Sequence, residues 1–199
     1  MSELSARFDA VFPALVGAGE PRLHAVLAVG LPPLAHRAQE VGLGRAVAVG
    51  AAAAAAIAAA VPGLGWWGGP EHAQLAVVPA GPAGVELGFA ALAAVDALAA
   101  QVPELALRAR AAIAWGPALG DALGAGASLA EAEALRLLLV AARPGELLGS
   151  AAHRAALRAA PPGVGAWDAP AERARRFGAP FVVWADHRAV PAGAFGRPG

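Results

Sequence analysis

The chain has 199 residues, a formal net charge of zero at neutral pH, a hydrophobic fraction of 58% and no cysteine. This length is typical of one domain with a substantial buried core. The balanced charge argues against a dedicated nucleic-acid-binding protein, and the lack of cysteine excludes disulfides, thiolate nucleophiles and cysteine-ligated zinc.

The N-terminal part predicts a polar lead-in, a buried strand and a long helical region. Residues 1–21 begin with MSELSARFDA, which is too charged for a signal peptide, so we expect a cytoplasmic protein. The run LHAVLAVGL at 23–31 is almost continuously apolar, which is typical of a buried strand. Pro32–Pro33 favours the first turn of a helix, and the helical pattern continues to Ala60.

The uncharged stretch from Ala46 to Pro70 has two interpretations. It is long and apolar, and Trp66–Trp67 lies near its end, where a transmembrane helix often carries aromatic residues. Pro62–Gly63, however, ends the helix before the roughly 20 apolar residues of a membrane span accumulate. We therefore expect a buried amphipathic helix and no membrane partner.

The rest of the chain predicts strands and helices in alternation. Two short strands at 64–79 flank a glycine-rich turn, and a helix at 85–100 follows. A strand at 105–115 carries Arg108 and Arg110 on one polar side. The remaining predicted elements are a helix at 129–142, a strand at 146–149, a helix at 151–159 and a strand at 181–185.

This order predicts an α/β (α+β) fold with a mainly antiparallel sheet. Strand, helix, strand, strand, helix, strand is the βαββαβ core of ferredoxin-like folds, here with a C-terminal extension of helices and strands. We expect one domain over 22–188 and a flexible tail at 189–199. The two central strands should be 23–31 and 72–78, adjacent and antiparallel.

Two C-terminal segments carry a resemblance to a known family. RARAAIAWGPALG at 108–120 resembles a strand and turn of class III nucleotide cyclases. LAEAEALRLLLVAARPGELLGSAAHRAAL at 129–157 resembles their helix, Pro-Gly-Glu turn, strand and Ser-led helix. The resemblance covers about residues 22–186, although its N-terminal half depends mainly on element order. The hairpin GGPEHAQLAVVP at 68–79 is also similar to the GGDEF hairpin of diguanylate cyclases, but the long C-terminal extension favours class III.

The resemblance implies a two-metal chemistry whose residues are missing here. Class III cyclases hold two metal ions between two Asp residues, and a partner subunit supplies an Asn, an Arg and a purine-binding Lys. The first Asp would fall at Val29 or Gly30, and the Asn and Arg positions hold Glu133 and Leu137. The chain contains no Lys and no Asn, and its Asp residues lie elsewhere, at positions 9, 96, 121, 168 and 186.

The second metal position of the resemblance falls at Glu71 or His72. These two are the candidate ligand-binding residues. A residual metal or nucleotide contact is one interpretation, but a single carboxylate rarely retains Mg²⁺, so we favour a solvated turn. We expect no catalytic residue, no metal site and no cofactor.

Two other groups of polar residues have structural interpretations. Ser150 and His153, three residues apart on a helix, could be a nucleophile and its base, but a helix-capping serine is the simpler interpretation. The short basic cluster Arg173, Arg175 and Arg176 is typical of a solvated face rather than an anion site.

These observations favour a catalytically inactive cyclase-like domain that acts as a dimerisation or partner-binding regulatory module. Its partner would be a second copy or another cyclase-like chain, with Trp66, Trp67 and Trp115 as candidate contact residues or core residues. The alternative is a nucleotide-binding sensor or divergent cyclase with a site rebuilt around Glu71 and His72. Nucleic acid and membrane are not expected partners.

Overall fold

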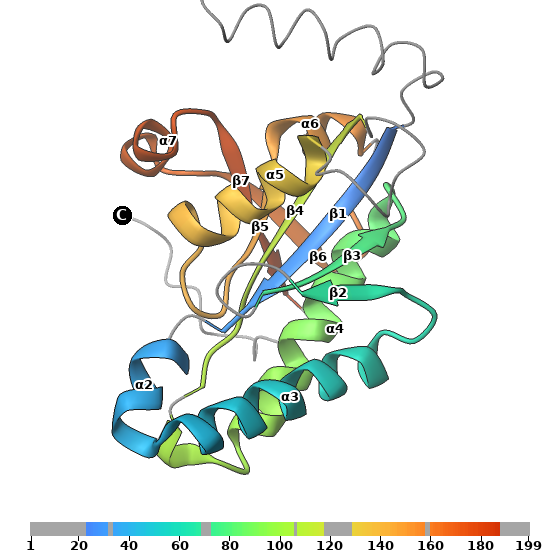
Figure 1. The fold of residues 1–199 in the computed structure, drawn as a ribbon. Coiled ribbons are helices and arrows are strands. Elements are labelled where there is room, and N and C mark those ends of the chain that lie inside the picture. Colours follow the sequence, from blue (N-terminus) through green and yellow to red (C-terminus); the bar gives the residue numbers. More distant parts are fainter. Residues whose placement is uncertain are drawn as a thin grey trace, which may run out of the picture.

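A seven-stranded sheet with helices on both faces forms the protein (Figure 1). The computed structural model describes residues 23–31, 34–68, 73–105, 107–117, 129–157 and 160–187. The strands are β1 (Leu23–Gly30), β2 (Trp66–Gly68), β3 (Gln74–Val78), β4 (Arg110–Pro117), β5 (Leu147–Ser150), β6 (Val164–Asp168) and β7 (Phe181–Asp186). The helices are α2 (Leu34–Val41), α3 (Leu43–Ala60), α4 (Pro82–Ala99), α5 (Leu129–Arg136), α6 (Ala151–Ala156) and α7 (Ala171–Phe177).

The strand order is β2-β3-β1-β4-β5-β7-β6, so β1 lies inside the sheet between β3 and β4. β1 pairs antiparallel with β3, from Ala25 opposite Val78 to Val29 opposite Gln74. On its other side β1 pairs antiparallel with β4, and β4 pairs parallel with β5. The predicted fold class and the predicted antiparallel pairing of 23–31 with 72–78 are therefore confirmed. The prediction that both strands are central is wrong for 72–78, because β3 is second from the sheet edge and β4 is the middle strand.

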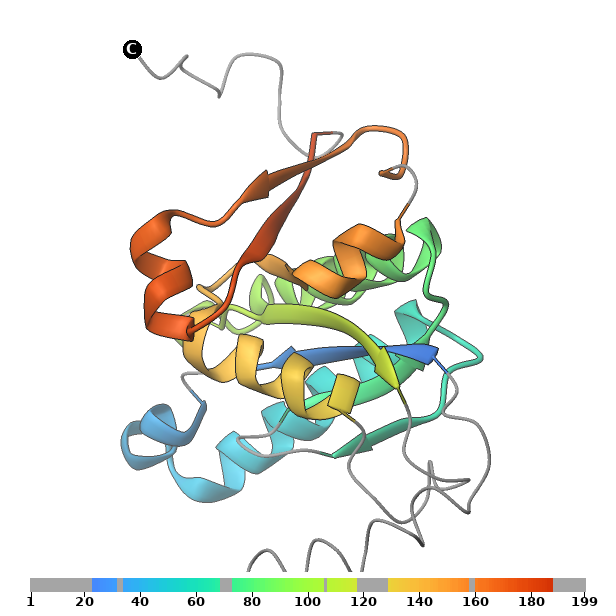
Figure 2. The ribbon, with the colours of Figure 1, turned by 90° about the horizontal axis from the view of Figure 1, so that it is seen from above.

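Both faces of β1 are covered, which explains its continuous apolar sequence. Ala25, Leu27 and Val29 point into a core shared with α3 and α4. Val26 and Ala28 point to the opposite face, into a core shared with α5 and with the π-helical turn η3 (Leu137–Ala141). The view from above shows α3 and α4 on one side of the sheet and α5 on the other (Figure 2).

The helix α3 ends at Ala60, as Pro62–Gly63 predicts, and packs on the core through only one face. Its buried residues are Ala46, Val49, Ala53 and Ile57. By length and composition alone, α3 and α4 are apolar enough to cross a membrane, with 22% and 33% of their residues buried. The expectation of a buried helix therefore holds for one side of α3, and the other side is exposed.

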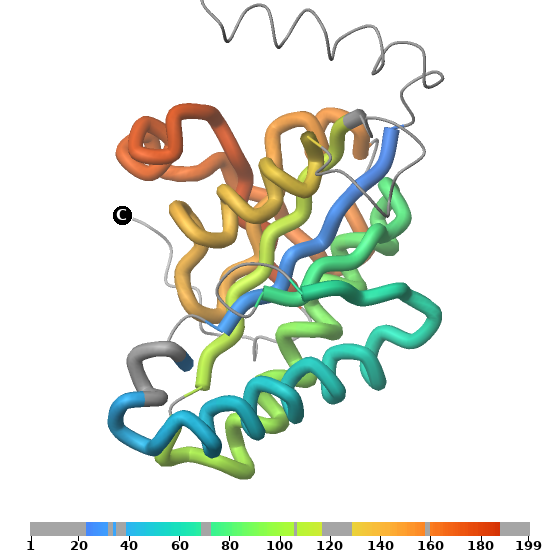
Figure 3. Tube along the Cα trace, in the orientation of Figure 1, coloured from blue at the N-terminus to red at the C-terminus, as the bar shows by residue number. Residues whose placement is uncertain are grey.

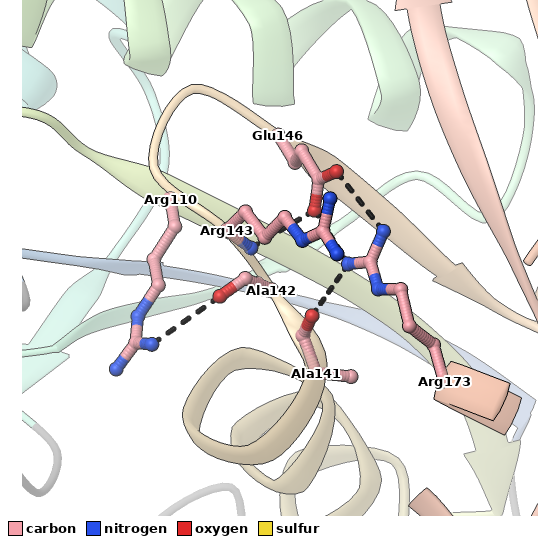
Figure 4. A network of polar contacts seen from close by, with 6 residues as sticks. All are labelled: Arg110, Ala141, Ala142, Arg143, Glu146 and Arg173. Atoms are coloured by element: carbon pink, nitrogen blue, oxygen red, sulfur yellow. Dashed lines mark hydrogen bonds and ion pairs between the residues drawn. The ribbon is translucent and has the colours of Figure 1, made fainter. Parts of the chain in front are cut away.

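The Pro-Gly-Glu turn lies between η3 and β5 and is held by an arginine from α7 (Figure 4). Gly145 adopts a φ of 82°, which favours glycine, and its backbone N–H donates to the carbonyl of Ala109. Arg173 donates to both carboxylate oxygens of Glu146 (3.0 and 2.6 Å) and to the carbonyl of Ala141 (2.5 Å). The turn therefore joins η3, β5 and α7.

This network corrects the prediction that the basic cluster is only a solvated face. Arg175 and Arg176 are exposed, but the side chain of Arg173 is only 14% exposed and pairs with Glu146. The ion pair satisfies charges that are partly removed from water, so Arg173 has a structural role.

Three other expectations differ from the structure along the C-terminal half, which Figure 3 traces as a tube. The strand predicted at 105–115 begins only at Arg110, because Pro103–Leu105 forms a 3₁₀ turn. The helix predicted at 129–142 changes to a π-helical turn after Arg136. The strand β6 and the helix α7 were not predicted at all.

Candidate functional site

The end of β1, where the resemblance places the first metal ligand, is filled by a leucine. Gly30 is the last residue of β1, and a Cβ built on it would lie 2.9 Å from Cδ2 of Leu138. Leu138 is fully buried in the core beneath α5. Val29 is also buried, but it points to the α3 and α4 side of the sheet. Neither position offers a ligand for a cation, and Gly30 has little space for one.

A positive charge lies at the same end of the sheet. Arg110, the first residue of β4, is the cross-strand partner of Gly30. Its Nη1 donates to the carbonyl of Ala142 at 3.3 Å (Figure 4). A guanidinium next to this position disfavours a divalent cation, because like charges repel.

The two candidate ligand residues, Glu71 and His72, lie outside the described residues, so their role stays a prediction. The strands that flank them, β2 and β3, are paired from Trp66 opposite Ala76 to Gly68 opposite Gln74. Within the described residues, no group of three or more histidine, aspartate and glutamate side chains lies close enough together to hold a metal ion.

Glu133 and Leu137 stand at the positions that the resemblance assigns to the partner's Asn and Arg. They belong to α5 and η3. Leu137 is fully buried in the core between α5 and the sheet, so it is not available to a ligand. Glu133 is on the outer side of α5, with 32% of its side chain exposed. One of its carboxylate oxygens lies 3.9 Å from Nη1 of Arg136.

Glu133 borders an open pocket of about 370 Å³. The pocket lies near Gly116, at the end of β4 opposite to Arg110, because β4 runs from Arg110 to Pro117. The Gly30 end and the pocket are therefore separate places on the sheet. The lining residues are Trp115, Gly116, Leu129, Glu133, Ser150, Ala151, Ala152, Ala179 and Pro180.

Ser150 caps α6, as the sequence predicts. Its Oγ accepts a hydrogen bond from the backbone N–H of His153 at 3.1 Å and another from that of Trp115 at 3.4 Å. The His153 ring is fully buried, and its nitrogens have no hydrogen-bond partner among the described residues. The ring instead lies edge-on to Trp184, at a centroid distance of 6.1 Å. Ser150 and His153 are therefore not a nucleophile and its base.

Burial lowers the pKa of His153 from 6.5 to about 4, because the charged form loses its hydration. The imidazole is therefore neutral at physiological pH.

The three candidate contact tryptophans are all partly buried. Trp66 and Trp115 pack against the core beneath α3 and α4, and Trp67 packs against the core beneath α5. Nε1 of Trp67 donates to Glu131 at 3.5 Å. A large part of each side chain therefore serves the core, and a contact with a partner stays a prediction for them.

No family model matches the chain, and no curated protein matches its sequence. Several solved structures match the chain by fold. The guanylyl cyclase Cya2 superposes with a TM-score of 0.63 and 16% identity, over 84% of this chain and 92% of that one. The adenylyl cyclase CyaB from P. aeruginosa gives a TM-score of 0.64 and 15% identity, over 83% and 95%. The chain has the fold of the nucleotide cyclases.

A bacterial light-regulated adenylyl cyclase shows the same cyclase fold, with a TM-score of 0.61 and 14% identity. That match covers 94% of this chain and 59% of the other chain. The likeness concerns the fold, since identity is low throughout. These neighbours support the predicted cyclase-like architecture, whereas the similarity to diguanylate cyclases stays a prediction.

Sequence reasoning predicted no metal ligand at Gly30, but it did not predict the side chain that lies beside this residue. In the cyclase-like fold, Leu138 reaches Gly30 from the π-helical turn after α5. The run Leu137-Leu138-Leu139 is apolar, but its sequence does not show this contact. The pocket beside Glu133 was also missed, because its lining residues come from four separate segments of the chain.

Proposed function

We propose that this domain is a catalytically inactive cyclase-like domain that acts as a dimerisation or partner-binding regulatory module. The close approach of Leu138 to Gly30 carries the proposal. Two-metal cyclisation needs a carboxylate at this end of β1, and here a buried leucine occupies the space beside a glycine. The cross-strand Arg110 adds a charge of the same sign as the metal ions.

The complementary half of the implied site supports the same proposal. Glu133 stands where the resemblance implies an Asn, and a carboxylate there repels a triphosphate. Leu137 stands where it implies an Arg, and this leucine is buried in the core. In a symmetric dimer of such chains, each site between the subunits therefore lacks the metal ligand from one subunit and the phosphate ligand from the other.

The exposed side of α3 supports a role in binding a partner. Leu43 is 72% exposed and Val47 is 57% exposed. No ionisable residue occurs between Ala46 and Ala60. An exposed, uncharged helix face of this kind is typical of a contact surface. The resemblance implies that the partner is a second copy or another cyclase-like chain.

The first experiment measures conversion of ATP and of GTP by the purified protein with Mn²⁺ in excess. An active class III cyclase, assayed in parallel, is the positive control. We expect no turnover above the buffer blank. Turnover that Glu71→Ala abolishes would contradict the proposal and would support the rebuilt site around Glu71 and His72.

The second experiment measures the mass of the protein by light scattering at tens of micromolar. We expect a dimer that Val47→Arg dissociates. Trp167→Arg is the control, since Trp167 is an exposed apolar residue on the edge strand β6. A monomer at this concentration, alone and with a cyclase-like partner chain, would count against a dimerisation module.

A further inference from the structure

The pocket beside Glu133 has the dimensions of a small-ligand site. Its volume of about 370 Å³ lies within the common range of roughly 300–1,000 Å³ for such sites. Most of its walls are apolar, and they include Leu129, Ala152 and Pro180. A ligand that fills it must therefore have an apolar body.

The only ionisable side chain among these lining residues is that of Glu133. Arg136, the cation paired with it among the described residues, is engaged elsewhere. Nη2 of Arg136 donates to the carbonyl of Phe177, and the guanidinium lies 4.4 Å from the centre of the Phe177 ring. Nη1 approaches the Glu133 carboxylate only to 3.9 Å. The carboxylate is therefore incompletely neutralised, so the pocket attracts cations and repels phosphate groups.

Ser150 supplies a second polar group to the pocket. A hydroxyl group has two acceptor lone pairs and one proton to donate. The lone pairs of Ser150 accept from the backbone N–H groups of His153 and Trp115. Among the residues that the structure describes, none accepts the hydroxyl proton. Ser150 lines the pocket, so this proton is available to a ligand acceptor.

We propose that this pocket binds a small organic monoamine that carries an apolar body and a hydrogen-bond acceptor. The ammonium group pairs with the carboxylate of Glu133, and the acceptor receives the proton of Ser150. The apolar body lies against Leu129, Pro180 and the neighbouring small residues. The site needs neither a metal ion nor a nucleotide, although Glu133 also stands where the resemblance implies an Asn of the partner's site.

Tyramine is a suitable probe, because it combines an ammonium group, an aromatic ring and a phenolic oxygen. Its affinity is compared by calorimetry with that of two analogues that keep the ring and change the charge, para-ethylphenol (neutral) and para-hydroxyphenylacetate (anionic). We expect tyramine to bind at least about tenfold more tightly than the neutral analogue, and the anion not to bind. Equal affinity of the three compounds, or no binding of tyramine at millimolar concentration, would overturn the proposal.

Two variants locate the site on the same protein. Glu133→Gln should reduce tyramine affinity to that of para-ethylphenol and leave the neutral analogue unaffected. Ala152→Phe, which places a ring in the pocket, should weaken both compounds. Glu172→Gln, an exposed glutamate on α7, is the control and should bind as the wild type does. Tyramine binding that survives both pocket variants would overturn the assignment, provided that circular dichroism shows both to be folded.

Discussion

A Cβ built on Gly30 would lie 2.9 Å from Cδ2 of Leu138, so the end of β1 and the turn after α5 are in close contact. The two residues come from segments that lie far apart in the chain, and both belong to the buried layer between α5 and the sheet. This end of β1 is therefore built as a core and not as an open metal site.

The contact predicts a coupling between the two positions. Gly30→Ala should lower the free energy of unfolding by about 1–2 kcal/mol, because the added methyl group overlaps a buried leucine. In a Leu138→Ala background the same change should cost almost nothing, since the cavity accepts the methyl group. Urea denaturation of the four proteins in this cycle measures the coupling. Simply additive losses would mean that the two side chains do not compete for space.

Arg173 should contribute more to stability than the other arginines of its cluster. Arg173→Ala removes the paired hydrogen bonds to Glu146 and the bond to the Ala141 carbonyl, and we expect a loss of about 2–3 kcal/mol. Arg173→Lys should keep only part of this stability, because an ammonium group cannot reproduce the planar, two-pronged hydrogen bonding of a guanidinium. The control, Arg176→Ala, removes an exposed side chain and should change stability by less than about 0.5 kcal/mol.

Gly149 should not tolerate any side chain. A Cβ at this position would overlap Nε1 of Trp184 and would lie 3.0 Å from Cγ2 of Val182. Gly149→Ala should therefore lower the free energy of unfolding by about 2–4 kcal/mol and change the fluorescence of the buried tryptophan. Gly65→Ala is the comparison, because nothing lies within 4 Å of the corresponding Cβ. Similar melting temperatures of the two variants would contradict this reading of the β5–β7 contact.

His153 should make the protein sensitive to mild acid. Its pKa is lowered from 6.5 to about 4 by burial, so between these values the unfolded chain binds a proton that the folded protein does not. The His153 contribution to stability is complete above about pH 6.5 and is lost as the pH falls to about 4, by about 3 kcal/mol in total. Chemical denaturation at several pH values measures this slope. His153→Leu should flatten it, and a variant with an unchanged slope would show that other groups cause the acid sensitivity.

The central part of the fold could be predicted from sequence because its signals are local and strong. The run at 23–31 is apolar on both faces of a strand, and both faces are covered. The Pro-Gly-Glu turn contains a glycine with positive φ, which its residue type allows. The strand β6 was missed because VGAWD is short, lies at the sheet edge and exposes Trp167. Its weak pattern becomes a strand only through pairing with β7.

For the candidate site, the sequence predicted only which ligand residues are missing. From residue types alone we expect no side-chain metal ligand at Gly30 and no phosphate ligand at Leu137. Residue types could not show that Leu138 fills the space beside Gly30, or that Glu133 and Ser150 border one pocket. Both facts depend on how distant segments pack, which no local pattern encodes.

The position of β1 between β3 and β4 has a consequence for synthesis on the ribosome. Of the described strands β1 is made first, yet both of its neighbours, β3 and β4, are made later. At the usual elongation rate of about 5–20 residues per second, this apolar strand stays without its β4 partner for several seconds. A nascent chain that ends before Arg110 therefore exposes one edge of β1, and we expect the folding chain to depend on chaperones during this interval.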